Sequence, residues 1–124
     1  MMKGVSLVII MMISMLSFYS FSSEATDAKT SLISFYHDKF NGRKTASGEI
    51  FDNSKYTAAH RSLPFGTKLK MTNMKNGKSV VVRINDRGPF HASRSLDVSK
   101  AAFKAIAAEG KGVIPVEYEV VNNL

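Results

Sequence analysis

Two β-patterned runs joined at Asn76-Gly77 constrain the fold of this 124-residue chain more than any other feature. Residues 67–73 alternate polar and apolar side chains, and residues 78–84 resume a β-branched pattern after the Asn-Gly pair. Strands on either side of Asn-Gly are the strongest short-range signal for an antiparallel hairpin. Because side chains alternate between the faces of a strand, one face of this hairpin is apolar and is expected in the core: Leu69 and Met71 in the first strand, and Val80, Val82 and Ile84 in the second.

Other segments add short strands and one helix to this hairpin. Four of them have strand-like patterns, although the second could also be a helical turn: residues 32–36, 56–59, 95–98 and 114–121. In the last strand three residues are expected inward: Val116, Tyr118 and Val120. Residues 100–109 carry an apolar stripe at helical spacing, with Ser99 as N-cap and Gly110 as the residue that stops the helix. These elements predict a mainly β fold, a small closed or nearly closed barrel.

The beginning of the chain has the pattern of a signal peptide. Lys3 precedes a long apolar run, and small serines near its end suit cleavage after Ser22. The alternative is an uncleaved anchor helix, for which the run is just long enough. We expect residues 1–22 to be a cleaved signal peptide, residues 23–31 a flexible lead-in and residues 32–122 the folded domain. The chain has no cysteine that could carry a lipid, so we expect no lipid anchor. We expect a monomer that is exported to the bacterial cell envelope, periplasmic or secreted, without a stable membrane anchor after signal cleavage.

The charge of the chain indicates an anionic partner. Its formal net charge is +7, and removal of residues 1–22 takes away only Lys3 among the charged residues, which leaves +6. A basic exported domain suits an anionic polymer or a membrane surface. Nucleic acid is the other partner to consider, but export argues against it, and no aromatic-rich basic strand of the base-stacking kind is present.

Several classes of chemistry can be set aside from the motifs. The three histidines, His37, His60 and His91, have no metal-ligand spacing, and thiolate ligands are absent. Neither a Gly-Lys-Ser phosphate loop nor a GxSxG elbow occurs, which argues against phosphoryl transfer and α/β-hydrolase chemistry. We therefore expect no metal and no cofactor, and carboxylate chemistry remains.

The strand at residues 81–85 ends abruptly at a carboxylate, Asp86, which is followed by Gly88-Pro89. Strand ends that enter such turns commonly present catalytic groups, although an aspartate there can also do no more than cap the turn. Cleavage of a glycosidic bond needs a carboxylic acid to protonate the leaving oxygen, and a hydrolase needs a second carboxylate. Glu49 or Asp52 could supply the second group. If a hydroxyl of the sugar itself attacks, a single carboxylate can serve as acid and then as base.

The acid of such a reaction must carry its proton when the substrate arrives. Burial of Asp86, or a neighbouring carboxylate such as Glu49, would favour the protonated form, whereas a nearby arginine would oppose it. Strand alternation directs Arg83 away from Asp86. Alternation can fail at the turn itself, so the direction of Arg87 stays open.

Five motifs occur in an order that resembles a known family. They are Thr45-Ala46-Ser47-Gly48-Glu49, residues 57–67 (TAAHRSLPFGT), Thr72-Asn73 with Asn76-Gly77-Lys78, residues 82–90 (VRINDRGPF) and Leu96-Asp97-Val98-Ser99. Together they resemble the rare lipoprotein A family of septal-ring lytic transglycosylases over residues 32–121. The resemblance implies a small six-stranded double-psi β-barrel with one or two short helices. It also implies endolytic cleavage of the β-1,4 bond between MurNAc and GlcNAc in peptidoglycan, which leaves 1,6-anhydro-MurNAc ends during wall remodelling or daughter-cell separation.

The resemblance also implies roles for individual residues. Asp86 is expected to be the general acid and then the base, and Glu49 and His60 to line the same groove and assist it. Four further residues are expected to contact the glycan: Tyr36, Asp52, Arg87 and Asp97. Many members have Ser-Trp-Tyr-Gly where this chain has Ser34-Phe35-Tyr36-His37, which is expected to alter sugar stacking but not the acid. The alternative function is a non-catalytic, expansin-like module that binds or loosens the wall.

Overall fold

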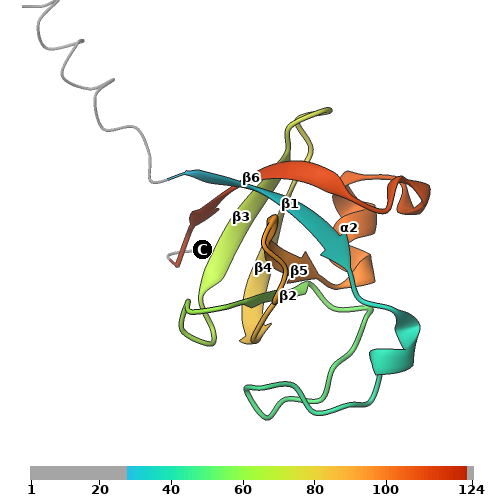
Figure 1. Cartoon of the computed structure of the whole chain (residues 1–124), viewed down its shortest axis with the longest axis vertical. Coiled ribbons are helices and arrows are strands. Elements are labelled where there is room, and N and C mark those ends of the chain that lie inside the picture. Colours follow the sequence, from blue (N-terminus) through green and yellow to red (C-terminus); the bar gives the residue numbers. More distant parts are fainter. Residues whose placement is uncertain (1–27, 123–124) are drawn as a thin grey trace, which may run out of the picture.

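The computed structural model describes residues 28–122 as a small β-barrel with one α-helix (Figure 1). The predicted signal peptide and its cleavage site lie outside the described residues. In chain order the elements are β1 (Lys29–Phe35), the 3-10 helix η1 (Asp38–Phe40), β2 (Thr57–His60), β3 (Lys68–Asn73), β4 (Ser79–Asp86), β5 (Arg94–Val98), α2 (Lys100–Ile106), the 3-10 helix η2 (Glu109–Lys111) and β6 (Ile114–Val120).

The six strands of the described region close into a barrel in the order β1-β5-β2-β4-β3-β6. β1 pairs in parallel with β5, and β2 pairs in parallel with β4, while the remaining pairs are antiparallel. Since β6 also pairs with β1, each strand has a neighbour on both sides, and closure leaves no unpaired sheet edge. The prediction of a mainly β, six-stranded barrel with a short helix is confirmed.

The hairpin predicted around Asn76-Gly77 is the β3–β4 pair. Leu69 faces Val82 and Met71 faces Val80 in its register, and these four side chains are buried. Gly77 supplies a backbone φ of +75°, a conformation that glycine adopts without steric cost. Local turn chemistry and the apolar face of the strands therefore agree with the long-range fold.

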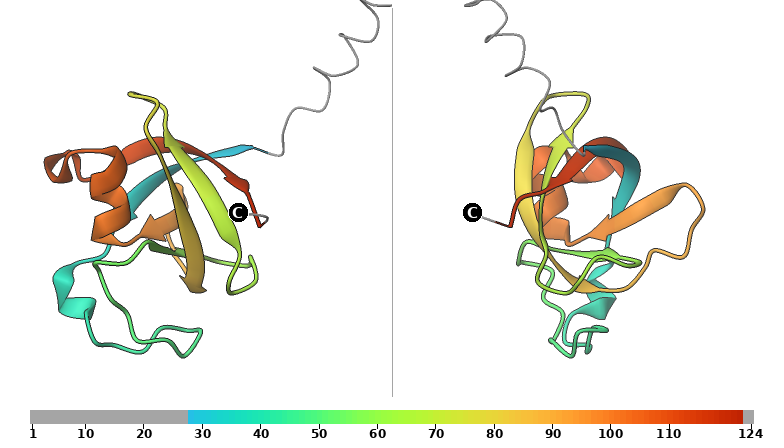
Figure 2. Two further views of the ribbon diagram at one scale, coloured as in Figure 1. Left: turned by 180° about the vertical axis from the view of Figure 1, so that it is seen from behind. Right: turned by 90° about the vertical axis from the view of Figure 1, so that its left-hand side faces the viewer.

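Helix α2 lies against the barrel and closes its core (Figure 2). Phe103 is fully buried, and its ring centroid lies 4.7 Å from that of Phe35 on β1. The Ser99 hydroxyl accepts the N–H of Ala102, as expected of an N-cap. Burial of one such aromatic side chain contributes on the order of 1.5–3 kcal/mol, so α2 is held mainly by its apolar stripe.

The helix ends at Ile106, not at residue 109, and the prediction that Gly110 stops it is wrong. Two side-chain amides from the β3–β4 hairpin region, those of Asn73 and Asn76, donate to the Ile106 carbonyl at 2.8 and 2.9 Å. They satisfy a carbonyl that the next helical turn would otherwise use. The chain becomes extended at Ala107, and Gly110 lies within η2.

Two other details differ from the sequence expectations, and one open alternative is decided. β1 begins at Lys29 and not at residue 32, because Lys29 already pairs with Tyr118 of β6, so residues 29–31 belong to the barrel and not to the lead-in. The ambiguous segment near residue 57 is a strand, β2. Val120, expected inward with Val116 and Tyr118, is 50% exposed because β6 reaches the rim of the barrel there.

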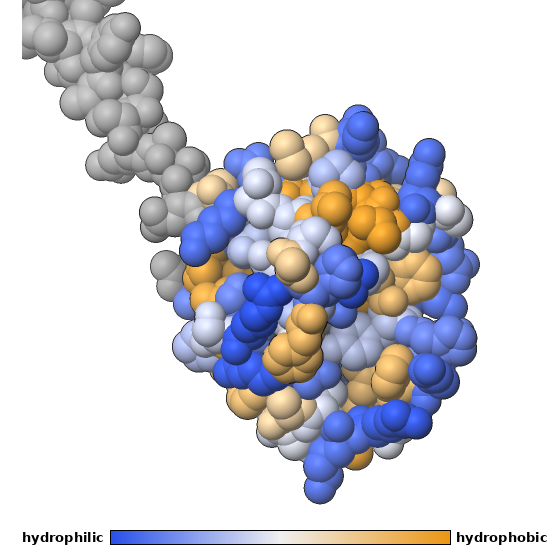
Figure 3. All heavy atoms as spheres, in the orientation of Figure 1, coloured by the Kyte–Doolittle hydropathy of each residue, from blue (hydrophilic) through white to orange (hydrophobic). Residues whose placement is uncertain are grey.

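The described surface is mixed in polarity. Figure 3 shows hydrophilic side chains over much of one face, with apolar residues in separate areas between them. Among residues 28–122 no helix is both long and apolar enough to cross a membrane.

Candidate active site

A row of four residues across neighbouring strands brings two carboxylates to the same face of the barrel wall. Ala59 of β2 pairs with Asp86 of β4 on one side and with Asp97 of β5 on the other, and Asp97 pairs with Ser34 of β1. Residues paired in register share a face of the sheet. Ala58, the neighbour of Ala59, faces the core, so the row lies on the opposite, outer face.

A β-bulge at Asn85 puts Asp86 on this outer face. Ala58 pairs with Ile84, but the next residue, Ala59, pairs with Asp86, so Asn85 is an extra residue in β4. Without the bulge, strict alternation would direct Asp86 to the same side as Ile84, into the core. The bulge therefore re-aims the carboxylate without interrupting the barrel.

The Asp86 carboxylate accepts hydrogen bonds from three donors in different parts of the chain. The Tyr36 hydroxyl donates to Oδ2 at 2.7 Å, and the backbone N–H groups of Ala46 and Arg87 donate to Oδ1 at 3.0 and 2.9 Å. Together these bonds determine the orientation of the carboxyl plane, which is the form of preorganisation that proton transfer requires.

Tyr36 follows β1 and lies on the same side as Ser34, two residues earlier. Its ring stacks on Phe51 at a centroid distance of 4.5 Å and meets the edge of Phe40 at 5.8 Å. Burial, and then the hydrogen bond to Asp86, raise the pKa of the Tyr36 phenol. The phenol therefore stays protonated and acts as a donor to Asp86.

The loop that carries Ala46 is anchored by Asn53, a buried residue that the sequence reasoning did not single out. Its Nδ2 donates to the Tyr36 carbonyl at 3.0 Å and to Asp38 Oδ1 at 2.9 Å, and its Oδ1 accepts the N–H of Lys100 at 2.7 Å. This amide thus ties the loop to both β1 and α2. Its only sequence signal was a position between Asp52 and Ser54 in a polar loop.

The sequence predicted that Glu49 lines the same groove as Asp86 and assists it, but the Glu49 side chain pairs with Arg83. Its Oε2 lies 2.8 Å from Nη1 of Arg83, and this hydrogen bond lowers the pKa of the glutamate. Glu49 and Asp52 line a separate pocket of about 290 Å³, of which Asp86 is not a lining residue. The motif at residues 45–49 bonds to Asp86 through the backbone N–H of Ala46 and not through Glu49. The turn at residues 45–48 points this N–H group at the Asp86 carboxylate.

His60 lies on the other side of the barrel wall from Asp86. It follows Ala59 in β2, so its side chain points toward the core side, and the ring meets Tyr118 at 6.5 Å. Its Nδ1 accepts the N–H groups of Ser62 and Leu63 at 3.1 and 3.0 Å. Burial and then the charge of Lys29 lower the pKa of His60. The expectation that His60 lines the same groove as Asp86 does not agree with this placement.

Both arginines near Asp86 in the sequence have other partners. Arg83 pairs with Glu49, and Arg87 donates from Nη1 to the carbonyls of His60 and Leu63 at 3.2 and 2.7 Å. The Arg87 guanidinium also lies 4.0 Å from the centroid of the Phe65 ring. Only the backbone N–H of Arg87 bonds to Asp86.

A third arginine, which the sequence reasoning missed, holds the loop that follows Asp86. Arg61 donates to the backbone carbonyls of Pro89, His91 and Arg94 at 2.6–2.8 Å. Since each of these bonds is charge-assisted, one side chain fixes a loop of several residues beside the site. Its position directly after His60 in the motif at 57–67 was the available signal.

The remaining predicted site residues fall into two environments. Asp97 Oδ1 accepts from the Ser34 hydroxyl at 2.9 Å and lies 3.5 Å from Arg94 Nε, a loose ion contact and not a hydrogen bond. Asp52 accepts from the hydroxyl and N–H of Ser54, which lowers the pKa of Asp52 and makes it a turn cap. Within residues 28–122, no group of three or more His, Cys, Asp or Glu side chains is arranged to hold a metal ion.

Comparison with known proteins agrees with the fold. The family model described as lytic transglycolase matches residues 29–118. A probable endolytic peptidoglycan transglycosylase RlpA of Treponema pallidum is 61% identical over 83 residues, which are 67% of this chain and 26% of the relative. The endolytic peptidoglycan transglycosylase RlpA of Pasteurella multocida is 50% identical over 94 residues, 76% of this chain and 32% of that protein. The chain thus spans about a quarter to a third of the length of these curated relatives.

Solved structures with the same fold are more distant in sequence. An expansin variant of Clavibacter michiganensis in complex with cellohexaose superposes with a TM-score of 0.64 at 22% identity, covering 78% of this chain and 52% of the expansin. The Streptomyces papain inhibitor superposes with a TM-score of 0.63 at 22% identity, covering 79% of this chain and 97% of the inhibitor. The closed six-stranded barrel of residues 28–122 and the family match define a double-psi β-barrel domain. The chain belongs to the lytic transglycolase family, and its curated relatives carry the name RlpA.

Proposed function

We propose that this domain is an endolytic lytic transglycosylase that cleaves the β-1,4 bond between MurNAc and GlcNAc in peptidoglycan. The family match and the names of the curated relatives support this assignment. The observation that carries it is the Asp86 carboxyl group, turned to the outer wall of the barrel and oriented by three donors. The net positive charge of the chain suits an anionic glycan polymer. We include in the proposal that residues 1–22 are a signal peptide that directs export to the cell envelope.

The proposed reaction needs one carboxyl group and no water. Asp86 gives its proton to the glycosidic oxygen while the bond from C1 to that oxygen breaks. The 6-hydroxyl of the same MurNAc then attacks C1, and Asp86 takes the proton that this hydroxyl releases. The products are a free 4-hydroxyl on GlcNAc and a 1,6-anhydro end on MurNAc. The Tyr36 hydroxyl and the two N–H groups stabilise the carboxylate that exists between the two proton transfers.

We propose that Glu49 and His60 are positioning residues. Glu49, paired with Arg83, steadies the loop whose Ala46 N–H bonds to Asp86. His60 caps the turn at residues 60–63, whose carbonyls hold the Arg87 side chain. Asp97, two strands away from Asp86 on the same face, and its partner Ser34 on the next strand are proposed to bind the glycan.

Incubation with purified sacculi tests this function, with mass spectrometry to detect anhydromuropeptides. The wild-type protein is expected to release them, and Asp86→Asn is expected to release none above background. Glu117→Gln, which changes an exposed carboxylate on β6, is the matched control and should retain wild-type activity.

A wild-type protein that binds sacculi but releases no anhydromuropeptides would replace the enzyme assignment with the alternative, a non-catalytic wall-binding module. Unchanged product from Asp86→Asn would instead assign the activity to another residue.

A further inference from the structure

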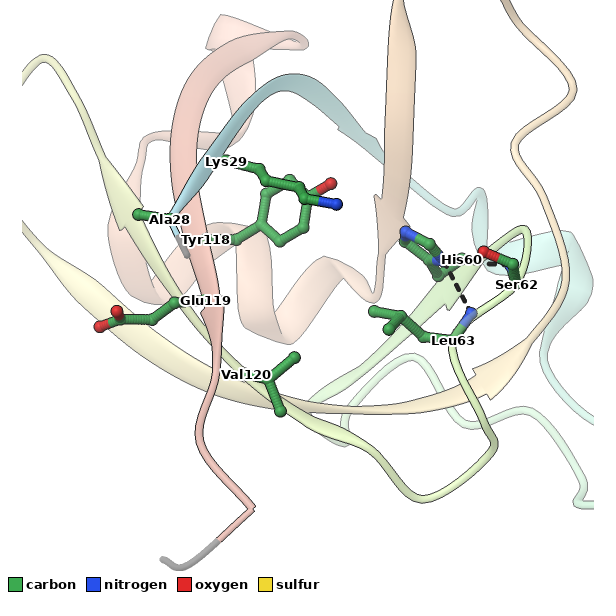
Figure 4. A pocket seen from close by; sticks show the side chains of 8 residues that line it. All are labelled: Ala28, Lys29, His60, Ser62, Leu63, Tyr118, Glu119 and Val120. Carbon is green, nitrogen blue, oxygen red and sulfur yellow. Dashed lines mark hydrogen bonds between the residues drawn. The ribbon is translucent and has the colours of Figure 1, made fainter. Parts of the chain in front are cut away.

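A pocket of about 600 Å³ opens at the rim of the barrel, where β1 begins and where β2 and β6 end (Figure 4). Lys29, His60 and Tyr118 come to it from these three strands. Lys29 is paired with Tyr118 in the β1–β6 register, and both share the core-facing side of their strands with Ile33 and Val116. The pocket therefore lies inside the rim, on the other side of β2 from Asp86, and the proposed reaction does not use it.

Three polar groups at this pocket, those of His60, Lys29 and Tyr118, are hydrogen-bond donors for which residues 28–122 supply no partner. Nδ1 of His60 is occupied as an acceptor of two backbone N–H groups, so the neutral ring carries its proton on Nε2, and Nε2 is directed away from that turn. Within residues 28–122, no hydrogen bond or ion pair engages His60 Nε2, the Lys29 ammonium or the Tyr118 hydroxyl. Figure 4 shows the three side chains facing the same hollow.

The charge around the pocket is positive and its walls are partly apolar. Lys29, Arg87 and Arg61 all act electrostatically on the His60 ring. The Glu119 side chain points away from the hollow in Figure 4, whereas Leu63 and Val120 project toward it. An ammonium, an imidazole N–H and a phenol can together bind both oxygens of a carboxylate, and the two aliphatic side chains can contact a small apolar group beside it.

We propose that this rim pocket binds a carboxylate carried on a short aliphatic group. Peptidoglycan has two carboxylates of this kind: the lactyl carboxylate of MurNAc, and the terminal carboxylate of a stem peptide that ends in alanine. The choice between these sources rests on the proposed function, whereas carboxylate binding itself does not.

NMR titration of the purified Asp86→Asn variant tests the pocket separately from catalysis. The His60 ring and Lys29 side-chain signals are followed while N-acetyl-D-alanine or N-acetylmuramic acid is added, and the source is the ligand that binds more tightly. We expect saturable shifts at both residues with one of these acids. N-acetyl-D-alanine amide, which lacks the charge, should bind at least about tenfold more weakly.

Variants of two lysines provide the matched comparison. Lys29→Met should weaken the binding of the acid about tenfold, whereas Lys104→Met, an exposed lysine on α2, should leave it unchanged. Equal binding of acid and amide, an unaltered affinity in Lys29→Met, or no binding of either acid would overturn the proposal. Because the titration does not depend on turnover, these outcomes are independent of whether the wild type releases anhydromuropeptides.

Discussion

At the scale of single residues, the position of Asp86 depends on one inserted residue and three donors. The bulge at Asn85 turns the carboxylate outward, and Tyr36, Ala46 and the N–H of Arg87 then hold it. Each donor comes from a different segment, so the site exists only when β1, the loop at residues 41–56 and β4 are all in place. Tyr36 is the one donor that a substitution can remove without changing the backbone.

Tyr36→Phe should lower the turnover number of the proposed reaction about ten- to a hundredfold, the equivalent of a hydrogen bond of about 1.5–3 kcal/mol to a charged group. KM should change little, because the ring and its stacking on Phe51 remain. The rate of release of anhydro ends from soluble glycan strands measures this effect. Tyr56→Phe, at a tyrosine that is 52% exposed, is the control and should behave as wild type. A rise in KM with an unchanged turnover number would instead make Tyr36 a binding residue.

At the scale of elements, short segments are terminated and held by side chains from distant parts of the chain. Helix α2 stops where Asn73 and Asn76 reach its last carbonyl, and the loop at residues 41–56 is anchored through Asn53. The β3–β4 hairpin is the exception, since its own turn residues determine its geometry. Gly77 has a φ of +75° there, and no atom lies within 4 Å of the position of an added Cβ.

Gly77→Ala should therefore lower the free energy of unfolding by about 1–2 kcal/mol through backbone strain alone. Gly110→Ala is the matched control, because its site is equally open and no left-handed φ is required. That variant should be neutral or more stable by up to about 1 kcal/mol, through a less flexible unfolded chain. Urea denaturation of both variants measures the difference. Equal stabilities would mean that the turn at Gly77 does not require its left-handed conformation.

At the scale of the whole molecule, folding stability should depend on pH through two separate groups of residues. Hydrogen bonds from Lys100, Arg83 and Ser54 lower the pKa values of Asp38, Glu49 and Asp52 respectively. Their contribution is complete above the unfolded carboxyl values of about 4 and is lost as the pH falls through the folded values. His60 acts at higher pH, because its pKa in the folded protein is lowered from an unfolded value of about 6.5.

Because the pKa of His60 is lower in the folded protein, the unfolded chain binds a proton at His60 at a higher pH than the folded chain does. Stability should fall as the pH decreases from 7.5 to 5.5, by less than about 1.4 kcal/mol per pH unit because the ring is only partly shielded from solvent. His60→Asn keeps an acceptor for the Ser62 and Leu63 N–H groups and should flatten this slope. His91→Gln, in an exposed loop, should retain it. Thermal or urea unfolding across this pH range measures both, and an unchanged slope in His60→Asn would assign the pH dependence to other groups.

The sequence by itself determined the features that depend on near neighbours. The Asn-Gly hairpin, the inward faces of β3 and β4 and the Ser99 cap follow from alternation, turn chemistry and capping within a few residues. The order of several motifs indicated the family, which the family match confirms, and predicted Asp86 as the catalytic carboxylate. Only the tertiary structure decided the bulge at Asn85, the choice of Ala46 over Glu49 as the partner of Asp86, and the placement of His60 on the opposite side of the wall. These depend on the register between strands that are tens of residues apart, and a shift of one residue moves a side chain to the other face.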